Sequence, residues 1–186
     1  MEKIIKIKNI KSAIKKYNYD QTKIGIEIDG KIYYDNKNNP YKYNDEYYWY
    51  PMIAQAINIK DQEKKYKYIY ETMCEILDNI SKQCDFKCDQ CKANRNGLSV
   101  NKIDGCCYFK EEGRCKYLKD KKCTNPNISC KLFMCEYIEK EMKFKSVPKN
   151  YPLLDLFFNK KQKEILQHSY KKNFEALKNI LIDKKM

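Results

Sequence analysis

Residues 23–34 read KIGIEIDGKIYY, and this stretch predicts a β-hairpin. Isoleucines at positions 24, 26 and 28 alternate with Gly25 and Glu27, which is the two-residue period of a half-buried strand. The dipeptide Asp29-Gly30 follows, and both residues accept the positive φ angles that a type I′ turn requires. We therefore expect residues 31–34 to return as the partner strand.

The sequence on either side of the hairpin is less decisive. Among the first 17 residues, isoleucines at positions 4, 7, 10 and 14 fit a helix face, whereas Ile5-Lys6-Ile7 fits a strand. Residues 35–50 read DNKNNPYKYNDEYYWY and predict a polar loop rich in aromatic side chains. Four aromatics at its end either pack onto the core, which is the interpretation we favour, or stack on nucleic-acid bases: Tyr47, Tyr48, Trp49 and Tyr50.

Helices are expected after this loop. Pro51 is placed to open a short helix over Met52–Asn58, and Asp61 is a candidate N-cap for a longer one that ends near Ser81. Cys74 lies on or near the apolar face of the longer helix, and we expect it to be a buried thiol. That face follows the i, i+3, i+4, i+7 rule and consists of Tyr66, Ile69, Tyr70, Met73, Ile76, Leu77 and Ile80.

Three further helical segments are predicted toward the C-terminus. One begins near Cys130 and carries Leu132, Cys135, Ile138 and Met142 on one stripe. The next follows Pro152 through LLDLFFNKKQKEIL. In the last, Asn173 is a candidate N-cap for FEALKNILI, with four side chains facing inward: Phe174, Leu177, Ile180 and Leu181.

Cysteine is the most informative residue type in this chain. The sequence contains 10 cysteines and a single histidine, His168. Residues 84–129 carry almost no large aliphatic side chains, so hydrophobic burial cannot offset the entropy lost when they become ordered. We expect another interaction to fix this segment. Nine cysteines cluster in or just after it: Cys84, Cys88, Cys91, Cys106, Cys107, Cys115, Cys123, Cys130 and Cys135.

The interpretation of these cysteines depends on whether the protein stays in the reducing cytosol or is exported. The N-terminal sequence lacks the continuous apolar segment of a signal peptide, and no apolar run approaches the roughly 20 residues of a transmembrane helix. We therefore expect a cytoplasmic protein that does not interact with membranes. In a reducing cytosol, clustered cysteines indicate metal or redox chemistry rather than disulfides.

All nine clustered cysteines are candidate metal ligands. Thiolates select zinc or iron–sulfur clusters over magnesium or calcium. The spacing Cys84-x3-Cys88-x2-Cys91 places three thiols on one loop, and nine thiols suffice for two four-thiolate centres. Irregular spacing and the absence of histidine favour an iron–sulfur cluster, while Zn²⁺ remains the alternative cofactor.

A longer pattern extends the comparison to a known family. From Cys107 the chain reads CYFKEEGRCKYL, and after Pro126 it reads CKLFMC. With the leading trio, this pattern resembles the YkgJ-type cysteine-cluster family, whose members are described as zinc- or iron-chelating domains. The resemblance covers 52 of the 186 residues and implies metal binding without naming a reaction. The matching positions are Cys84, Cys88 and Cys91, then Cys107 and Cys115, then Cys130, Lys131, Phe133 and Cys135.

This chain departs from the family pattern in places. Lys92 stands where the family doubles a cysteine, and Cys106 and Cys123 are additional thiols, one of which could replace that ligand. The leading trio alone also resembles the cluster-binding spacing of radical-SAM enzymes. Those enzymes need a larger barrel, so we do not adopt this interpretation.

Net charge says little about partners. The formal charge is +13, but it comes almost entirely from lysine, because Arg95 and Arg114 are the only arginines. Arginine is the residue that grips phosphate bidentately and reads guanine. We interpret the lysines mainly as a solvated surface.

The sequence thus predicts an α+β fold. It comprises an N-terminal β-hairpin with helices, a loop-rich cysteine segment stapled by metal, and C-terminal helices. We divide the chain into residues 1–60, 61–147 and 148–186, forming one compact unit. The predicted function is a metal-cluster protein in electron transfer, redox sensing or metal handling. Two alternatives are a zinc-stabilised module that docks a protein partner and a single-stranded nucleic-acid binder; whether the protein is an enzyme stays open.

Overall fold

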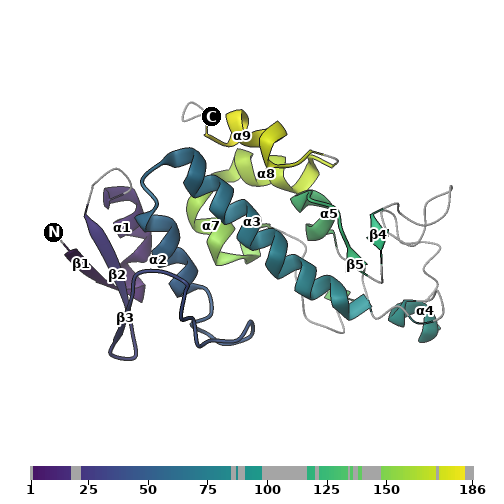
Figure 1. Cartoon of the computed structure of the whole chain (residues 1–186), viewed down its shortest axis with the longest axis horizontal. Helices are drawn as coiled ribbons and strands as arrows, with labels where there is room; N and C mark the ends of the chain where they lie inside the picture. The colour runs from purple at the N-terminus through teal and green to yellow at the C-terminus, as the bar shows by residue number, and fades with distance from the viewer. Residues whose placement is uncertain are drawn as a thin grey trace.

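The chain is mixed α and β, with a three-stranded sheet at one end, helices along its length and a two-stranded sheet toward the other end (Figure 1). None of the helices in the described part of the chain combines the length and hydrophobicity needed to cross a membrane. The computed structural model describes residues 2–17, 22–84, 87, 91–97, 117–119, 122–133, 135, 138–139, 148–170 and 172–182.

The predicted hairpin is confirmed. It consists of β2 (Lys23–Ile28) and β3 (Lys31–Tyr33), which pair antiparallel across a two-residue loop. The φ angles are 47° at Asp29 and 76° at Gly30, so both central residues adopt the positive values of a type I′ turn. The isoleucines of β2 at positions 24, 26 and 28 are fully buried, as the alternation predicts.

Both interpretations of the first 17 residues are correct in part. β1 (Glu2–Lys6) pairs in parallel with the hairpin's first strand, giving the order β1-β2-β3. Parallel neighbours need a crossover, and here it contains η1 (Ile7–Asn9) and α1 (Ile10–Tyr17). Ile10 and Ile14 join the core beside the β2 isoleucines.

The aromatic loop packs onto the core. It leads into α2 (Tyr50–Asn58), whose last residue bonds the sheet: the Asn58 side chain accepts from the Ile24 N–H and donates to the Ile24 carbonyl, both at 2.8 Å. Trp49 meets the ring of Tyr151 edge-on, with centroids 5.9 Å apart. The loop aromatics that pack against the core are half-buried: Tyr41, Tyr43, Tyr47, Tyr48, Trp49 and Tyr50.

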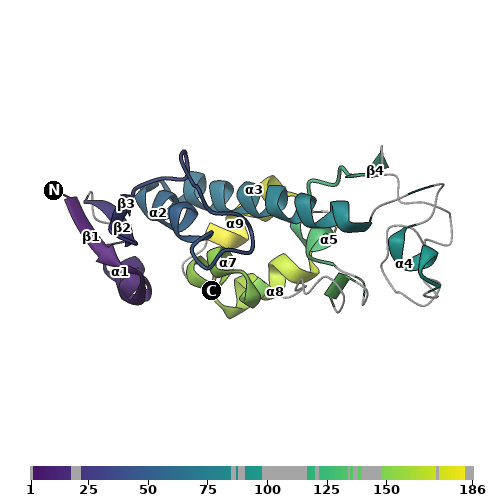
Figure 2. The same cartoon turned by 90° about the horizontal axis from the view of Figure 1, so that it is seen from below.

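The helix α3 (Gln62–Ser81) runs from the sheet end toward the opposite end of the molecule (Figures 1 and 2). Asp61 caps it as predicted, because its Oδ1 accepts from the Lys64 N–H at 2.7 Å. The predicted apolar face is buried at Ile69, Tyr70, Met73, Ile76 and Leu77.

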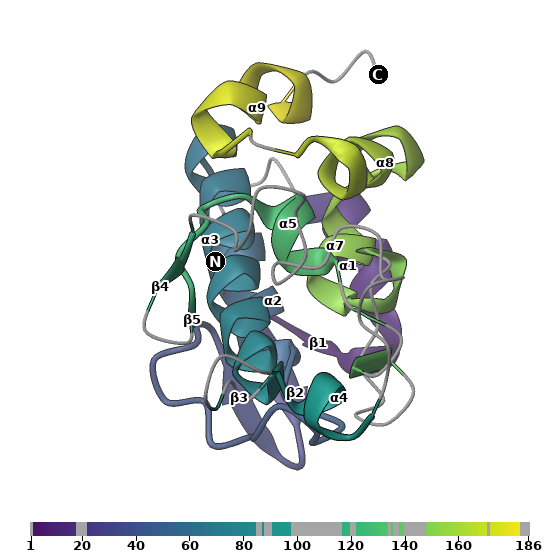
Figure 3. The same ribbon diagram turned by 90° about the vertical axis from the view of Figure 1, so that its right-hand side faces the viewer.

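The C-terminal region folds back along α3. Three helices contact it: α5 (Ile128–Leu132), α7 (Pro152–Phe157) and α9 (Phe174–Ile182). Viewed end-on, α7 and α8 (Lys160–His168) lie to one side of α3, with α9 at its N-terminal end (Figure 3). Asn173 is confirmed as the N-cap of α9, since its Oδ1 accepts from the Ala176 N–H at 3.1 Å.

Two features of this region differ from the prediction. The expected continuous helix after Pro152 breaks into α7 and α8, because Phe158 is extended and Asn159 starts a new helix. Asn159 and Gln162 form a capping box, each side chain accepting from the other's backbone N–H at 2.9 and 2.8 Å. Ile180 is 37% exposed rather than facing inward.

Candidate functional site

The structure describes the side chains of four predicted ligands: Cys84, Cys91, Cys130 and Cys135. Cys123 is described through its backbone, in the two-residue strand β5 (Lys122–Cys123), which pairs antiparallel with β4 (Leu118–Lys119). The other predicted ligands lie outside the described residues: Cys88, Cys106, Cys107 and Cys115.

Cys84 and Cys91 lie where the chain leaves α3. The short 3-10 helix η2 (Lys82–Cys84) continues α3, and Cys84 is half-buried against the core. Cys91 is buried and directly precedes α4 (Lys92–Arg95), its carbonyl accepting from the Arg95 N–H at 3.0 Å. Since α4 contacts η2, the turn that carries Cys91 lies against the turn that carries Cys84.

Cys130 lies in the first turn of α5, and Asn127 holds that turn in place. Asn127 is 1% exposed, and its side-chain Oδ1 accepts from the Cys130 N–H at 2.9 Å. Its Nδ2 donates to the Ser169 carbonyl at 2.8 Å and also to the Lys172 carbonyl. One buried amide therefore fixes the backbone at Cys130 to the segment between α8 and α9.

Cys135 lies beyond α5, which corrects the predicted stripe. The helix ends at Leu132 because Phe133 is extended, with φ −67° and ψ 122°. Cys135 is half-buried, and its carbonyl accepts from the Glu139 N–H at 3.1 Å. The prediction of one continuous helix with Leu132, Cys135 and Ile138 on a single stripe is therefore wrong, and the fourth residue of that stripe, Met142, lies outside the described residues.

One face of α3 binds the segment that leads to Cys130. The Tyr70 hydroxyl accepts from the Ile128 N–H at 3.0 Å and lies 3.3 Å from the Pro126 carbonyl oxygen. Burial raises the pKa of Tyr70 well above its ordinary value, which keeps the hydroxyl protonated and able to donate. Two turns further along α3, Asp78 forms an ion pair with the buried ammonium group of Lys131.

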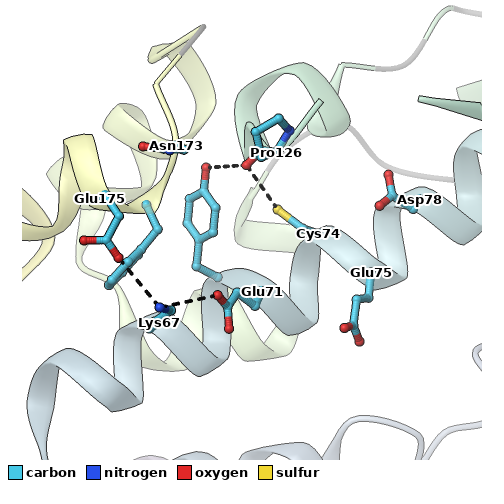
Figure 4. A pocket seen from close by; sticks show the side chains of 10 residues that line it. Lys67, Glu71, Cys74, Glu75, Asp78, Pro126, Asn173 and Glu175 are labelled. Carbon is cyan, nitrogen blue, oxygen red and sulfur yellow. Dashed lines mark hydrogen bonds and ion pairs between the residues drawn. The ribbon is translucent and has the colours of Figure 1, made fainter. Parts of the chain in front are cut away.

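Cys74 lies between these two contacts and is not the buried thiol that we expected. It is half-buried, and its Sγ points from α3 toward Pro126, 4.0 Å from the carbonyl oxygen (Figure 4). The side chain lines a cavity of about 400 Å³ between α3, the Pro126 segment and the start of α9.

The rim of this cavity is charged. Glu71 and Glu175 face it from α3 and α9, and the Lys67 ammonium lies 3.9 Å from the first and 3.7 Å from the second. Tyr70 and Phe174 supply its apolar wall, with ring centroids 5.6 Å apart. The cavity thus combines an aromatic wall, ion-paired carboxylates and one thiol.

The described residues do not by themselves complete a metal centre. Among them, no three Cys, His, Asp or Glu side chains form a group that could hold a metal ion. The structure does attach Cys84 to the end of α3 and Cys130 to its side through α5. Sequence reasoning missed Asn127 and Tyr70; the N-cap preference of asparagine pointed to the first, whereas the packing of Tyr70 on Ile128 depends on residues 58 positions apart.

Comparison with known proteins identifies no similar protein. No family model matches the chain, and no curated protein or solved structure matches it either.

Proposed function

We propose that this chain is a metal-cluster protein whose cysteine thiolates hold an iron–sulfur cluster. The observation that supports this most directly is the attachment of thiol-bearing segments to one helix. Cys84 and Cys91 lie on contacting turns at the C-terminal end of α3, and Cys130 lies in α5, which packs along its side. Ligands drawn from separate segments that share one rigid support suit a multi-thiolate centre.

The chemistry of the cysteine segment supports the same proposal. Thiolates bind soft and borderline metals, and metal binding supplies folding free energy to a segment that cannot bury an apolar core of its own. Cys91 is only 6% exposed, and a low-dielectric surrounding of this kind tunes the potential of a cluster and limits its contact with water. Electron transfer, redox sensing and metal handling are the roles that such a centre would serve.

Metal analysis tests the proposal. Protein purified without oxygen is assayed for iron, zinc and acid-labile sulfide, and its visible absorption is recorded. We expect a brown protein with iron and sulfide in comparable amounts. Stoichiometric zinc without sulfide would instead support the zinc-stabilised interaction module. Protein that holds neither metal, with its cysteines paired as disulfides, would refute both.

Serine variants identify the ligands. Cys91→Ser and Cys130→Ser should each lower the metal content, because a lost thiolate removes a metal–sulfur bond. Cys74→Ser is the matched control, since it removes a thiol from α3 beside the segment that leads to Cys130 without removing a proposed ligand. Full metal content in both ligand variants, or loss of metal in the control, would contradict this assignment.

A further inference from the structure

We propose that Cys74 and Cys130 form a redox-active dithiol that closes to a disulfide between α3 and α5. This inference goes beyond the metal proposal and involves a cysteine that the metal proposal leaves out. It assigns Cys74, which stands apart from the other nine cysteines in the sequence, to the thiol chemistry of the protein.

Two contacts fix how α3 and α5 are aligned with each other. Residues 70, 74 and 78 are spaced by four and therefore share one face of α3. At one end of this row the Tyr70 hydroxyl bonds the Ile128 N–H at 3.0 Å, and at the other end Asp78 pairs with Lys131. Cys74 lies between Tyr70 and Asp78 on this face of α3. Cys130 lies between their partners, Ile128 and Lys131, in the sequence of α5.

A contact of Cys74 places its thiol against the segment that leads into the first turn of α5, which carries Cys130. The Cys74 Sγ lies 4.0 Å from the carbonyl oxygen of Pro126, and the Cys130 N–H is bound by Asn127, the next residue. Both cysteines are half-buried.

The cavity gives an oxidant access to Cys74. Its volume of about 400 Å³ admits a small hydroperoxide with room to spare. Among the described residues, four carboxylates line the cavity: Glu71 and Glu175 are ion-paired with Lys67 on the rim, Asp78 is ion-paired with Lys131, and Glu75 lies between Glu71 and Asp78 along α3. Because the Cys74 side chain itself lines the cavity, a small neutral oxidant that enters the cavity reaches the thiol.

The reaction balances with hydrogen peroxide as the oxidant. One thiol is oxidised to a sulfenic acid as the O–O bond breaks and one water leaves. The second thiol attacks that sulfur, the S–S bond forms, and the sulfenic oxygen departs as a second water. Two thiols each lose one electron and one proton, and both peroxide oxygens are reduced to water.

Disulfide mapping of the whole chain tests the inference. Anaerobically purified protein, as isolated and after treatment with a chelator and reductant, is exposed to a small excess of hydrogen peroxide. It is then blocked with N-ethylmaleimide and digested without reduction. We expect a peptide linking Cys74 to Cys130 that dithiothreitol separates, in the chelator-treated sample at least, because a bound metal would protect Cys130.

The Cys135→Ala variant is the matched control and should still form the link, whereas Cys74→Ala should not. Oxidised protein in which both residues remain alkylated, or in which Cys74 pairs with another cysteine, would overturn the inference. Metal and sulfide measured on the same preparation keep the two proposals separate. Metal without the link refutes only the dithiol, and the link without metal refutes only the cluster.

Discussion

Replacing Tyr70 with phenylalanine should weaken the attachment of α5 to α3. The substitution keeps the ring, which packs on Phe174, and removes only the hydroxyl. That hydroxyl accepts from the Ile128 N–H at 3.0 Å and lies 3.3 and 3.4 Å from the carbonyl oxygens of Pro126 and Lys172. Because it has one hydrogen, it donates to one of these carbonyls at a time.

The size of the destabilisation follows from the backbone groups that lose their hydrogen-bond partner in the Tyr70→Phe variant. Ile128 is 0% exposed, so its N–H would lose its partner where water cannot replace it. An unsatisfied buried donor costs about 1–3 kcal/mol, and the lost donated bond adds about 1 kcal/mol. We therefore expect the free energy of unfolding to fall by about 2–4 kcal/mol. At roughly 2–4 °C per kcal/mol, the melting temperature should fall by roughly 4–16 °C.

Thermal and urea denaturation followed by far-ultraviolet circular dichroism measure this effect, with metal content matched between samples. Tyr170→Phe is the control, because Tyr170 is 48% exposed. That variant should stay within about 0.5 kcal/mol of the unmodified protein. If Tyr70→Phe is equally neutral, the hydroxyl does not hold the first turn of α5. The alignment of Cys74 with Cys130 would then depend on the Asp78–Lys131 ion pair alone.

Four other outcomes are expected. Asn159→Ala removes the capping box with Gln162 and should cost about 0.5–2 kcal/mol in urea denaturation, whereas an unchanged midpoint would argue against the cap. Gly30→Ala places a side chain at φ 76° and should cost about 1–2 kcal/mol, measured the same way; no loss would mean that the turn relaxes. Burial lowers the pKa of Lys65 to about 8, so the folded state binds fewer protons than the unfolded state between about pH 8 and 10.5. Stability should therefore rise with pH from about 8 by an increment that Lys65→Met abolishes, and parallel curves for the two proteins would refute this. Removing metal should speed hydrogen exchange within residues 84–130 and spare the hairpin; equal protection with and without metal would contradict the metal's structural role.

Features decided by neighbouring residues were predictable from the sequence. The hairpin follows from alternation and from Asp29-Gly30, and the starts of α3 and α9 follow from Asp61 and Asn173 acting as caps. In each case the interacting groups lie within a few residues of one another. Local chemistry therefore determines the structure whatever the rest of the chain does.

Other features of the fold could not be predicted, because they depend on two local signals that compete or on residues far apart in the sequence. The apolar pattern after Pro152 is compatible with one helix, and only the capping box at Asn159 breaks it. Ile180 lies about 90° around α9 from the centre of the row formed by Phe174, Leu177 and Leu181, at 100° per residue, so it falls outside the buried stripe. The parallel pairing of β1 joins segments about 20 residues apart, which alternation within either strand does not reveal.

The candidate site likewise has properties set by neighbouring residues and properties set by residues far apart in the sequence. The sequence identifies the thiols and predicts a chemistry for them, because spacing and residue type are local properties. The orientation of Cys74 depends instead on where residues 126–131 lie against α3, more than 50 positions along the chain. The buried amide of Asn127 likewise takes its partners from Ser169 and Lys172, which no local pattern names.

The return of the chain along α3 also sets an order of events during synthesis. The sheet and α2 use residues available early, but the buried stripe of α3 is covered by α5, α7 and α9, which end at Ile182. About 100 residues separate the end of α3 from that point, and ribosomes add about 5–20 residues each second. For about 5–20 seconds, then, a nascent chain presents Ile69, Met73 and Leu77 to solvent. During the same interval its cysteines emerge one after another, so the cell's chaperones and its supply of metal meet this protein before its core has closed.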